Sequence, residues 1–154
     1  AGLSMTDADG HNVEIDYSLP KSMEKTFSIP LPELGGGIYK ISWRAMGNSG
    51  MEMAVLTGDP RTAAPYSFMV KVPKGTRLPP HAHPDAWRHS TIISGTLLWA
   101  FGDTFDEASM ITLTPGSFWT EPSGANHYGW ARDGDVLAVG TAMGPSGMIP
   151  VGTE

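Results

Sequence analysis

Short runs in which apolar and polar residues alternate recur along the chain from residue 38 onward. In Tyr66–Val72, for example, every second side chain is aromatic or aliphatic. A period of two is typical of β-strands that bury one face. Turn-forming pairs such as Asp133-Gly134 separate the runs and favour hairpins. We predict strands over residues 38–43, 51–56, 66–72, 77–83, 91–94, 96–101, 110–113, 117–120, 127–130 and 136–141.

The number and spacing of these runs predict an all-β fold. Nineteen glycines and thirteen prolines fall between the runs, and no segment carries a convincing helical pattern. A chain of 154 residues is long enough for one domain with a hydrophobic core. Strands at this spacing suit a jelly-roll β-barrel, which closes two sheets around a central cavity. We expect this barrel to occupy residues 38–154.

Residues 1–37 differ from the rest of the chain because they show no sustained periodicity. Their prolines and the run Gly35–Gly37 predict an extended N-terminal arm with at most one short strand. His11 lies alone in this arm, so we expect it to be exposed rather than to bind a metal. Arms of this kind often cover the sheet edge of a neighbouring subunit, and we therefore expect a homodimer.

Composition and charge exclude several classes of protein. The formal net charge is −6, and no cluster of Lys or Arg could follow a phosphate backbone, so we expect no nucleic-acid partner. No apolar stretch approaches membrane-spanning length, so we expect no membrane partner. The absence of cysteine excludes disulfides, thiolate nucleophiles and cysteine metal ligands. Four residues precede Met5, which suits either a cytoplasmic protein or a secreted or periplasmic protein processed before Ala1.

Three histidines stand out as candidate metal ligands. His81 and His83 lie one residue apart in an extended segment, so their side chains share one face and can reach the same ion. His127 follows Pro122-Ser123-Gly124, a tight turn that delivers it to the start of the next strand. Three neutral nitrogen ligands without cysteine suit one divalent ion of Fe, Mn, Zn, Ni or Cu. Such a site leaves positions open for water or a small-molecule substrate.

The spacing of these histidines resembles the two motifs of the cupin superfamily, over about residues 51–147. The first motif is Gly75, five residues, His81, Ala82, His83 and a closing Gly95; the second is Gly116, five residues, Pro122, Ser123, Gly124, two residues and His127. The resemblance implies a small single-domain cupin, whose fold is the jelly roll also called the double-stranded β-helix. It leaves the first fifty residues unexplained.

One position departs from the cupin pattern. The first motif usually carries a glutamate, a fourth metal ligand, six residues before its closing glycine, and this chain has Arg88 there. Arginine stays protonated and cannot bind a cation. Either three histidines alone form the site, or Asp85 or His89 supplies a fourth ligand. On a regular strand His89 would face the opposite side of the sheet, so its use requires a bulge after Trp87.

The resemblance implies one of two functions. The first is a metal-dependent enzyme acting on a small anionic or dicarbonyl-like molecule, with dioxygenase-type chemistry or Lewis-acid chemistry such as that of a lyase, isomerase or cyclase. The alternative is a cupin that binds or senses a metal or small ligand without turnover. Fold-level analogy does not choose between them.

Three further residues are candidates for catalysis. Arg88 would favour an anionic substrate if it faces inward, whereas on the surface it would flank a hairpin. Glu121 precedes Pro122 in the second motif, Tyr128 follows His127, and both are possible acid–base groups. Their alternative interpretations are a surface carboxylate at a strand end for Glu121 and, for Tyr128, a side chain that alternates away from His127. Of the aromatic residues, we expect two or three to line a pocket, from among Trp99, Phe101, Trp119, Tyr128 and Trp130.

Overall fold

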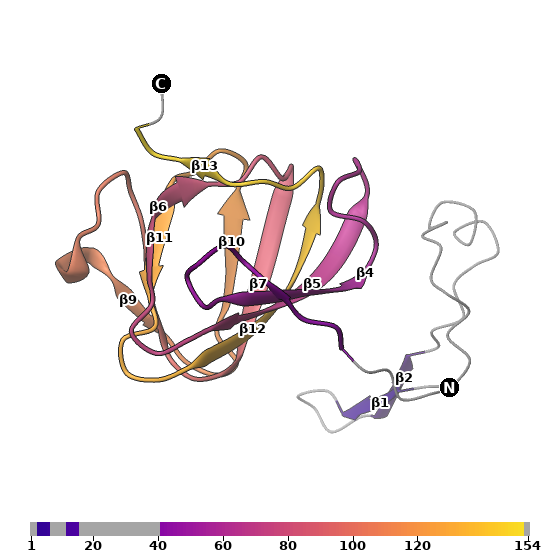
Figure 1. Ribbon diagram of the computed structural model, residues 1–154. Helices are drawn as coiled ribbons and strands as arrows, with labels where there is room; N and C mark the ends of the chain where they lie inside the picture. The colour runs from indigo at the N-terminus through magenta and orange to yellow at the C-terminus, as the bar shows by residue number, and fades with distance from the viewer. Residues whose placement is uncertain (1–2, 7–11, 16–40, 153–154) are drawn as a thin grey trace. The chain divides into compact units, whose positions relative to one another are not determined.

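The computed structural model describes residues 3–6, 12–15 and 41–152, and almost every element in these ranges is a β-strand (Figure 1). The chain divides into two compact units, residues 1–33 and 34–154. In the first unit, β1 (Leu3–Thr6) and β2 (Asn12–Ile15) form an antiparallel pair, so the arm has two strands where the sequence predicted at most one. Most of the predicted arm, its boundary after residue 37 and His11 lie outside the described residues.

The second unit is a jelly roll made of two antiparallel sheets, as the sequence predicted. The six-stranded sheet has the order β10 (Phe118–Pro122), β7 (Trp87–Ser94), β12 (Val136–Met143), β5 (Pro65–Val72), β4 (Glu52–Thr57) and β3 (Arg44–Ala45). The five-stranded sheet has the order β13 (Ile149–Pro150), β6 (Arg77–Ala82), β11 (His127–Trp130), β8 (Leu97–Phe101) and β9 (Ile111–Leu113). A short 3-10 helix, η1, spans Glu107–Ser109. In the described part of the chain no helix is long and apolar enough to cross a membrane.

The hydrophobic core lies between the two sheets and follows the alternation seen in the sequence. In β5, Tyr66, Phe68 and Val72 are buried, and the residues between them are less so. Burial of such side chains contributes about 1.5–3 kcal/mol each relative to exposure. β12 alternates in the same way, whereas β8 and β11 are buried along most of their length. The inner faces of the two sheets enclose the core. They also form the walls of the site described below.

Apart from shifts of one or two residues at strand ends, the observed strands differ from the predicted ones at three places. The predicted strand over residues 38–43 is not formed within its described part, and the pairing lies instead at Arg44–Ala45. β7 begins at Trp87, four residues before the predicted start at Thr91, because its polar first half pairs with β10 and β12 on both sides. The short strand β13 was not predicted, since two exposed residues paired with β6 carry no periodicity.

Glycines of the two histidine motifs take backbone conformations that other residues rarely adopt. Gly95, in the turn between β7 and β8, has φ +81°, and a Cβ atom there would overlap the backbone carbonyl oxygen of Asp135. Gly75 has φ +83°, yet a Cβ atom there would meet nothing within 4 Å. The two glycines therefore share one conformational constraint and differ in packing.

Alanine variants of Gly75 and Gly95 test how much close packing matters in the turn at Gly95. We expect Gly75→Ala to cost about 1–2 kcal/mol of unfolding free energy, the strain of a left-handed backbone at a residue with a Cβ atom. Gly95→Ala should cost clearly more, because the methyl group also displaces the backbone at Asp135. Urea unfolding followed by circular dichroism measures both. Equal losses in the two variants would mean that close packing at Gly95 contributes nothing.

Candidate metal centre

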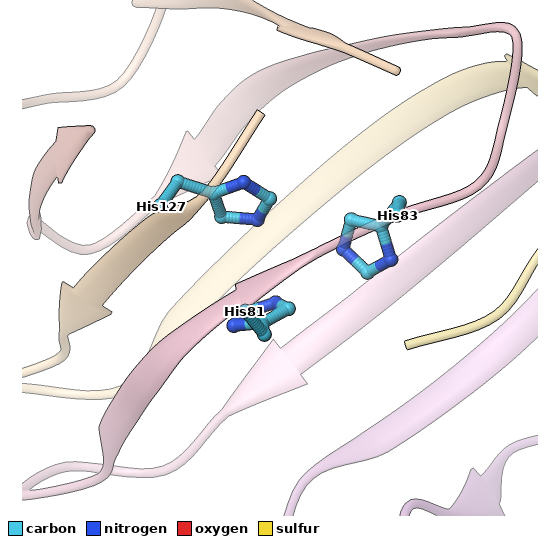
Figure 2. A group of neighbouring side chains, drawn as sticks. All are labelled: His81, His83 and His127. Carbon is cyan, nitrogen blue, oxygen red and sulfur yellow. The ribbon is translucent and has the colours of Figure 1, made fainter. Parts of the chain in front are cut away.

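The three candidate histidines lie together on the inner face of the five-stranded sheet. His81 is in β6, His83 follows the end of that strand, and His127 begins β11. The two strands are antiparallel neighbours in which His81 and His127 are directly paired. The ring centroids are 4.4 Å apart for His81 and His127, 5.0 Å for His81 and His83, and 5.2 Å for His83 and His127. Figure 2 shows the three rings turned toward one common space.

Backbone carbonyls orient all three rings in the same way. Each Nδ1 lies within hydrogen-bond distance of a carbonyl oxygen: His81 of Pro79 at 2.7 Å, His83 of Gly147 at 2.6 Å and His127 of Ala125 at 3.0 Å. A carbonyl only accepts hydrogen bonds, so Nδ1 must carry the proton. In a neutral ring Nε2 then presents its lone pair to the space between the rings. Metal-binding histidines are commonly oriented by this kind of contact.

Burial keeps at least two of these rings neutral. It lowers the pKa of the His83 imidazole to about 4, and the nearby Arg88 guanidinium adds to this shift. Burial also lowers the pKa of His127 to about 4. Both rings are therefore uncharged at pH 7, which is the state that binds a metal ion.

Charged residues from the six-stranded sheet face the histidines across the interior. Arg88 of β7 lies inward, with its side chain 12% exposed, and its Nε is 3.0 Å from Oε2 of Glu121. Its Nη1 donates a hydrogen bond to the Tyr66 hydroxyl at 3.1 Å and lies 3.9 Å from Oδ1 of Asp85. The surface alternative for Arg88 is therefore wrong. Glu121 is also buried, so it is not a surface carboxylate either.

The two carboxylate oxygens of Glu121 have different surroundings. Oε1 accepts a hydrogen bond from the indole Nε1 of Trp119 at 2.9 Å. Oε2 is buried without an aligned hydrogen-bond donor among the described residues, although Arg88 Nε is close to it. Oε2 also lies 3.7 Å from Nε2 of His83 and 3.8 Å from Nε2 of His127. These distances are too long for hydrogen bonds.

The donor set fits a divalent transition metal. The candidate ligand atoms of the three histidines lie within 4.8 Å of one another. An ion bound to imidazole nitrogens at about 2.0–2.1 Å holds neighbouring ligand atoms about 3–3.5 Å apart. Small ring movements would therefore bring all three Nε2 atoms to one ion. Oε2 of Glu121, ion-paired with Arg88, also lies within 4 Å of Nε2 of His83 and His127 and adds a negative group to this space.

The histidines open into a narrow cavity between the sheets, with about 80 Å³ of space for water-sized molecules. A single water needs about 10–15 Å³ by this measure, so the cavity admits only a small ligand. Its walls include Trp99, which stacks on His127 with centroids 4.5 Å apart, and Trp119. Of the five aromatic residues considered from the sequence, these two line it.

Other candidates from the sequence are used elsewhere in the structure. His89 stacks on Trp87 outside the cavity, because β7 and β10 pair in regular register and no bulge turns it inward. Asp85 is buried but accepts hydrogen bonds from Tyr66 and Ser146, and it does not line the cavity. Tyr128 donates to the backbone carbonyl of Asp106, away from the cavity lining.

One buried group of residues behind Arg88 carries no signal in the sequence as a group. The Tyr66 hydroxyl donates to Asp85 at 2.6 Å, and Ser146 donates to the other oxygen of Asp85 at 3.1 Å. Burial raises the pKa of Tyr66 to about 12. Alternation in β5 suggested that Tyr66 points inward, but nothing in the sequence pairs it with residues so far along the chain.

Comparison with known families agrees with this geometry. The model of the cupin domain family matches residues 68–139, which contain all three histidines. Residues 68–139, nearly half of the chain, are therefore identified as a cupin domain. No curated protein matches the chain in sequence.

Many solved structures share the fold. DMSP lyase DddQ from Ruegeria pomeroyi DSS-3 has 19% identity and a TM-score of 0.59, over 74% of this chain and 64% of DddQ. An RmlC-like cupin from Shewanella frigidimarina NCIMB 400 has 16% identity and a TM-score of 0.55, over 68% of this chain and 84% of that one. KdgF from Halomonas sp. has 18% identity and a TM-score of 0.53, over 66% and 86%. Similarity at this level establishes the fold alone.

The lowered pKa values predict how the metal-free protein responds to pH. Unfolded histidine has a pKa of about 6.5, whereas His83 and His127 have pKa values of about 4 when folded. Between these values the unfolded chain binds more protons, so the unfolding free energy should decrease as pH falls from 6.5 toward 4. Each unit of depression contributes about 1.4 kcal/mol. Urea unfolding of chelator-treated protein at several pH values measures this.

The variants His83→Asn and His127→Asn should each show a flatter dependence on pH than the wild type. His89→Asn, outside the cavity, is the matched control and should keep the wild-type slope. If all three variants show the same slope as the wild type, the cavity histidines are not the source of the effect.

Proposed function

We propose that this chain is a metal-dependent cupin enzyme that acts on a small anionic or dicarbonyl-like molecule. The observation that carries the proposal is the set of three inward Nε2 atoms, each fixed by a carbonyl bound to Nδ1 of the same ring. His81, His83 and His127 would hold one divalent ion of Fe, Mn, Zn, Ni or Cu. When bound, the ion would supply a Lewis acid or a site for dioxygen.

Formal charge in the cavity and directly behind it, where Asp85 lies next to Arg88, supports an anionic ligand. The three histidines are counted as neutral, Arg88 is positive, and Glu121 and Asp85 are negative. The metal-free site thus has one negative charge in excess. A divalent ion changes this to one positive charge in excess. Because the site is buried, that charge is poorly screened and favours a single small anion.

The cavity walls determine what such a ligand would meet. Two tryptophans provide flat apolar surfaces, and the buried indole N–H of Trp99 has no hydrogen-bond partner among the described residues. A carboxylate or carbonyl oxygen of the ligand would supply an acceptor for such a donor. Tyr66 stays protonated because burial raises its pKa to about 12, so it serves as a donor behind Arg88 rather than as a base.

The names of structurally similar cupins agree with an enzymatic role. They include DMSP lyase DddQ and an oxalate oxidase in complex with glycolate, which has 20% identity and a TM-score of 0.53. These proteins suggest lyase-type and oxidase-type chemistry as the first reactions to assay. Turnover of any small carboxylate or dicarbonyl compound would distinguish an enzyme from a cupin that only binds its ligand.

Metal stoichiometry tests the three-histidine site. Purified protein loaded with Zn²⁺ and desalted should contain one ion per chain by elemental analysis. Replacing His81, His83 or His127 singly by alanine should remove stoichiometric metal, because each substitution removes one nitrogen ligand of the ion. His89→Ala should keep the full content, since its ring lies outside the cavity. Full metal content in all three cavity variants would refute the assignment.

Anion binding tests the substrate class. Calorimetric titration with glycolate or oxalate should show binding to the Zn²⁺-loaded protein and none to the metal-free protein, because only the loaded cavity has positive charge in excess. At saturating Zn²⁺, Arg88→Gln should still bind one ion but bind the anion more weakly by about 1.5–3 kcal/mol, the range for a hydrogen bond to a charged group. Equal affinity in loaded and metal-free protein would rule out the metal as the anion's binding partner.

A further inference from the structure

We infer that Glu121 is the fourth protein ligand of the proposed metal site and that Arg88 positions it. The inference rests on the three-histidine site proposed above and adds a carboxylate that reaches the ion from the facing sheet. Glu121 belongs to β10 of the six-stranded sheet. On the five-stranded sheet, His81 lies in β6, His83 directly after β6, and His127 in β11. The ion would therefore join the two sheets of the barrel.

Strand register brings this carboxylate to the right place. β10 pairs with β7 in an uninterrupted antiparallel register, in which Glu121 is directly opposite Arg88. Directly paired residues point to the same face of a sheet, about 4.5–5.5 Å apart at Cβ. Arg88 occupies the first-motif position at which an acidic ligand would be expected. Glu121, the residue paired with Arg88 across the two strands, supplies an acidic group instead.

The contacts of Glu121 leave one oxygen available for a metal. Trp119 Nε1 holds Oε1 at 2.9 Å, so the carboxylate cannot rotate without losing that bond. Oε2 then points toward the histidines, at 3.7 Å from Nε2 of His83 and 3.8 Å from Nε2 of His127. Ligands of one ion lie at similar though slightly shorter separations, about 3–3.5 Å. These separations would let Oε2 reach an ion held by His83 and His127 as a single-oxygen ligand.

A direct ion pair between Glu121 and a histidine explains these contacts less well. It would need a proton on Nε2, but the ring of His127 is buried, that of His83 is half-buried, and both already donate from Nδ1. The distances also exceed those of a hydrogen bond. Lone pairs on Oε2 and on two Nε2 atoms thus face one another, and a shared cation satisfies all of them.

Arg88 has the contacts expected of a positioning residue. Its Nε is 3.0 Å from Oε2 of Glu121, without the alignment of a hydrogen bond. Its Nη1 is anchored by the Tyr66 hydroxyl, which is itself bound to Asp85. The guanidinium also lies over the Phe68 ring, 4.2 Å from the centroid. A positive group fixed in this way restrains Glu121 and offsets part of the cost of burying its charge.

The test compares metal binding by wild type, Glu121→Gln and Glu107→Gln, with Zn²⁺ and Co²⁺ as probes. Competition with a chelator gives the Zn²⁺ affinity, and the visible absorption of Co²⁺ reports its ligands. Glutamine keeps the size of Glu121 and an oxygen for Trp119 but removes the charge. Glu107 is an exposed carboxylate paired with Arg132 and is the matched control. Unfolding of the metal-free proteins checks that each variant folds.

We expect Glu121→Gln to bind one ion with affinity lowered about 100-fold or more, above the 10–100-fold typical of residues that only orient ligands. Its Co²⁺ spectrum should differ from that of the wild type, and Glu107→Gln should match the wild type in both. The double variant Arg88→Glu with Glu121→Gln returns a carboxylate to the paired position. It should recover affinity relative to Glu121→Gln alone.

Three results would overturn the inference. Unchanged affinity in Glu121→Gln would show that the carboxylate does not bind the metal. Lower affinity with an unchanged Co²⁺ spectrum would mean that Glu121 acts at a distance. In both cases the histidine variants still lose metal, so the three-histidine proposal stands. If the wild type binds no ion, or the histidine variants bind it normally, both proposals fail.

Discussion

Lone pairs that face one another inside the barrel constrain the whole site. The Nδ1 atoms of His81, His83 and His127 are committed to carbonyls, so each neutral ring presents only an acceptor at Nε2. Oε2 of Glu121 adds another acceptor within 4 Å of two of them. A buried group of acceptors without an aligned donor is unfavourable, and a cation relieves it. The site is therefore suited to binding a positive ion.

The jelly roll assembles this arrangement by placing two inner faces opposite each other. β6 and β11 bring the histidines together from one sheet, and β7 and β10 bring Arg88 and Glu121 from the other. Behind Arg88, a second layer of Tyr66, Asp85 and Ser146 fixes the guanidinium. Each contact depends on strand register, because a shift of one residue would turn every one of these side chains to the outer face.

Sequence alone predicted the elements with local signals and missed those set by pairing. Alternation predicted most strands, and the spacing of glycines, prolines and histidines predicted that His81, His83 and His127 share one site. The direction of Arg88 was undecided, because only the two neighbours of β7 show that its polar first half is a strand. The burial of Glu121 could not be predicted from the sequence either. Trp119 and Glu121 alternate onto one face of β10. No local pattern shows that this face continues the inner face of β7, where Arg88 lies directly opposite Glu121.

The most direct measurement of the central claim is anomalous diffraction from crystals of Zn²⁺-loaded protein, recorded on both sides of the zinc absorption edge. We predict one anomalous peak per chain in the cavity, about 2.0–2.1 Å from Nε2 of His81, His83 and His127. The rings should keep their Nδ1 contacts with the backbone. A cavity without a peak, in which Nε2 of His83 or His127 donates a hydrogen bond to Glu121, would contradict this account. It would show that a proton rather than a metal joins the two sheets.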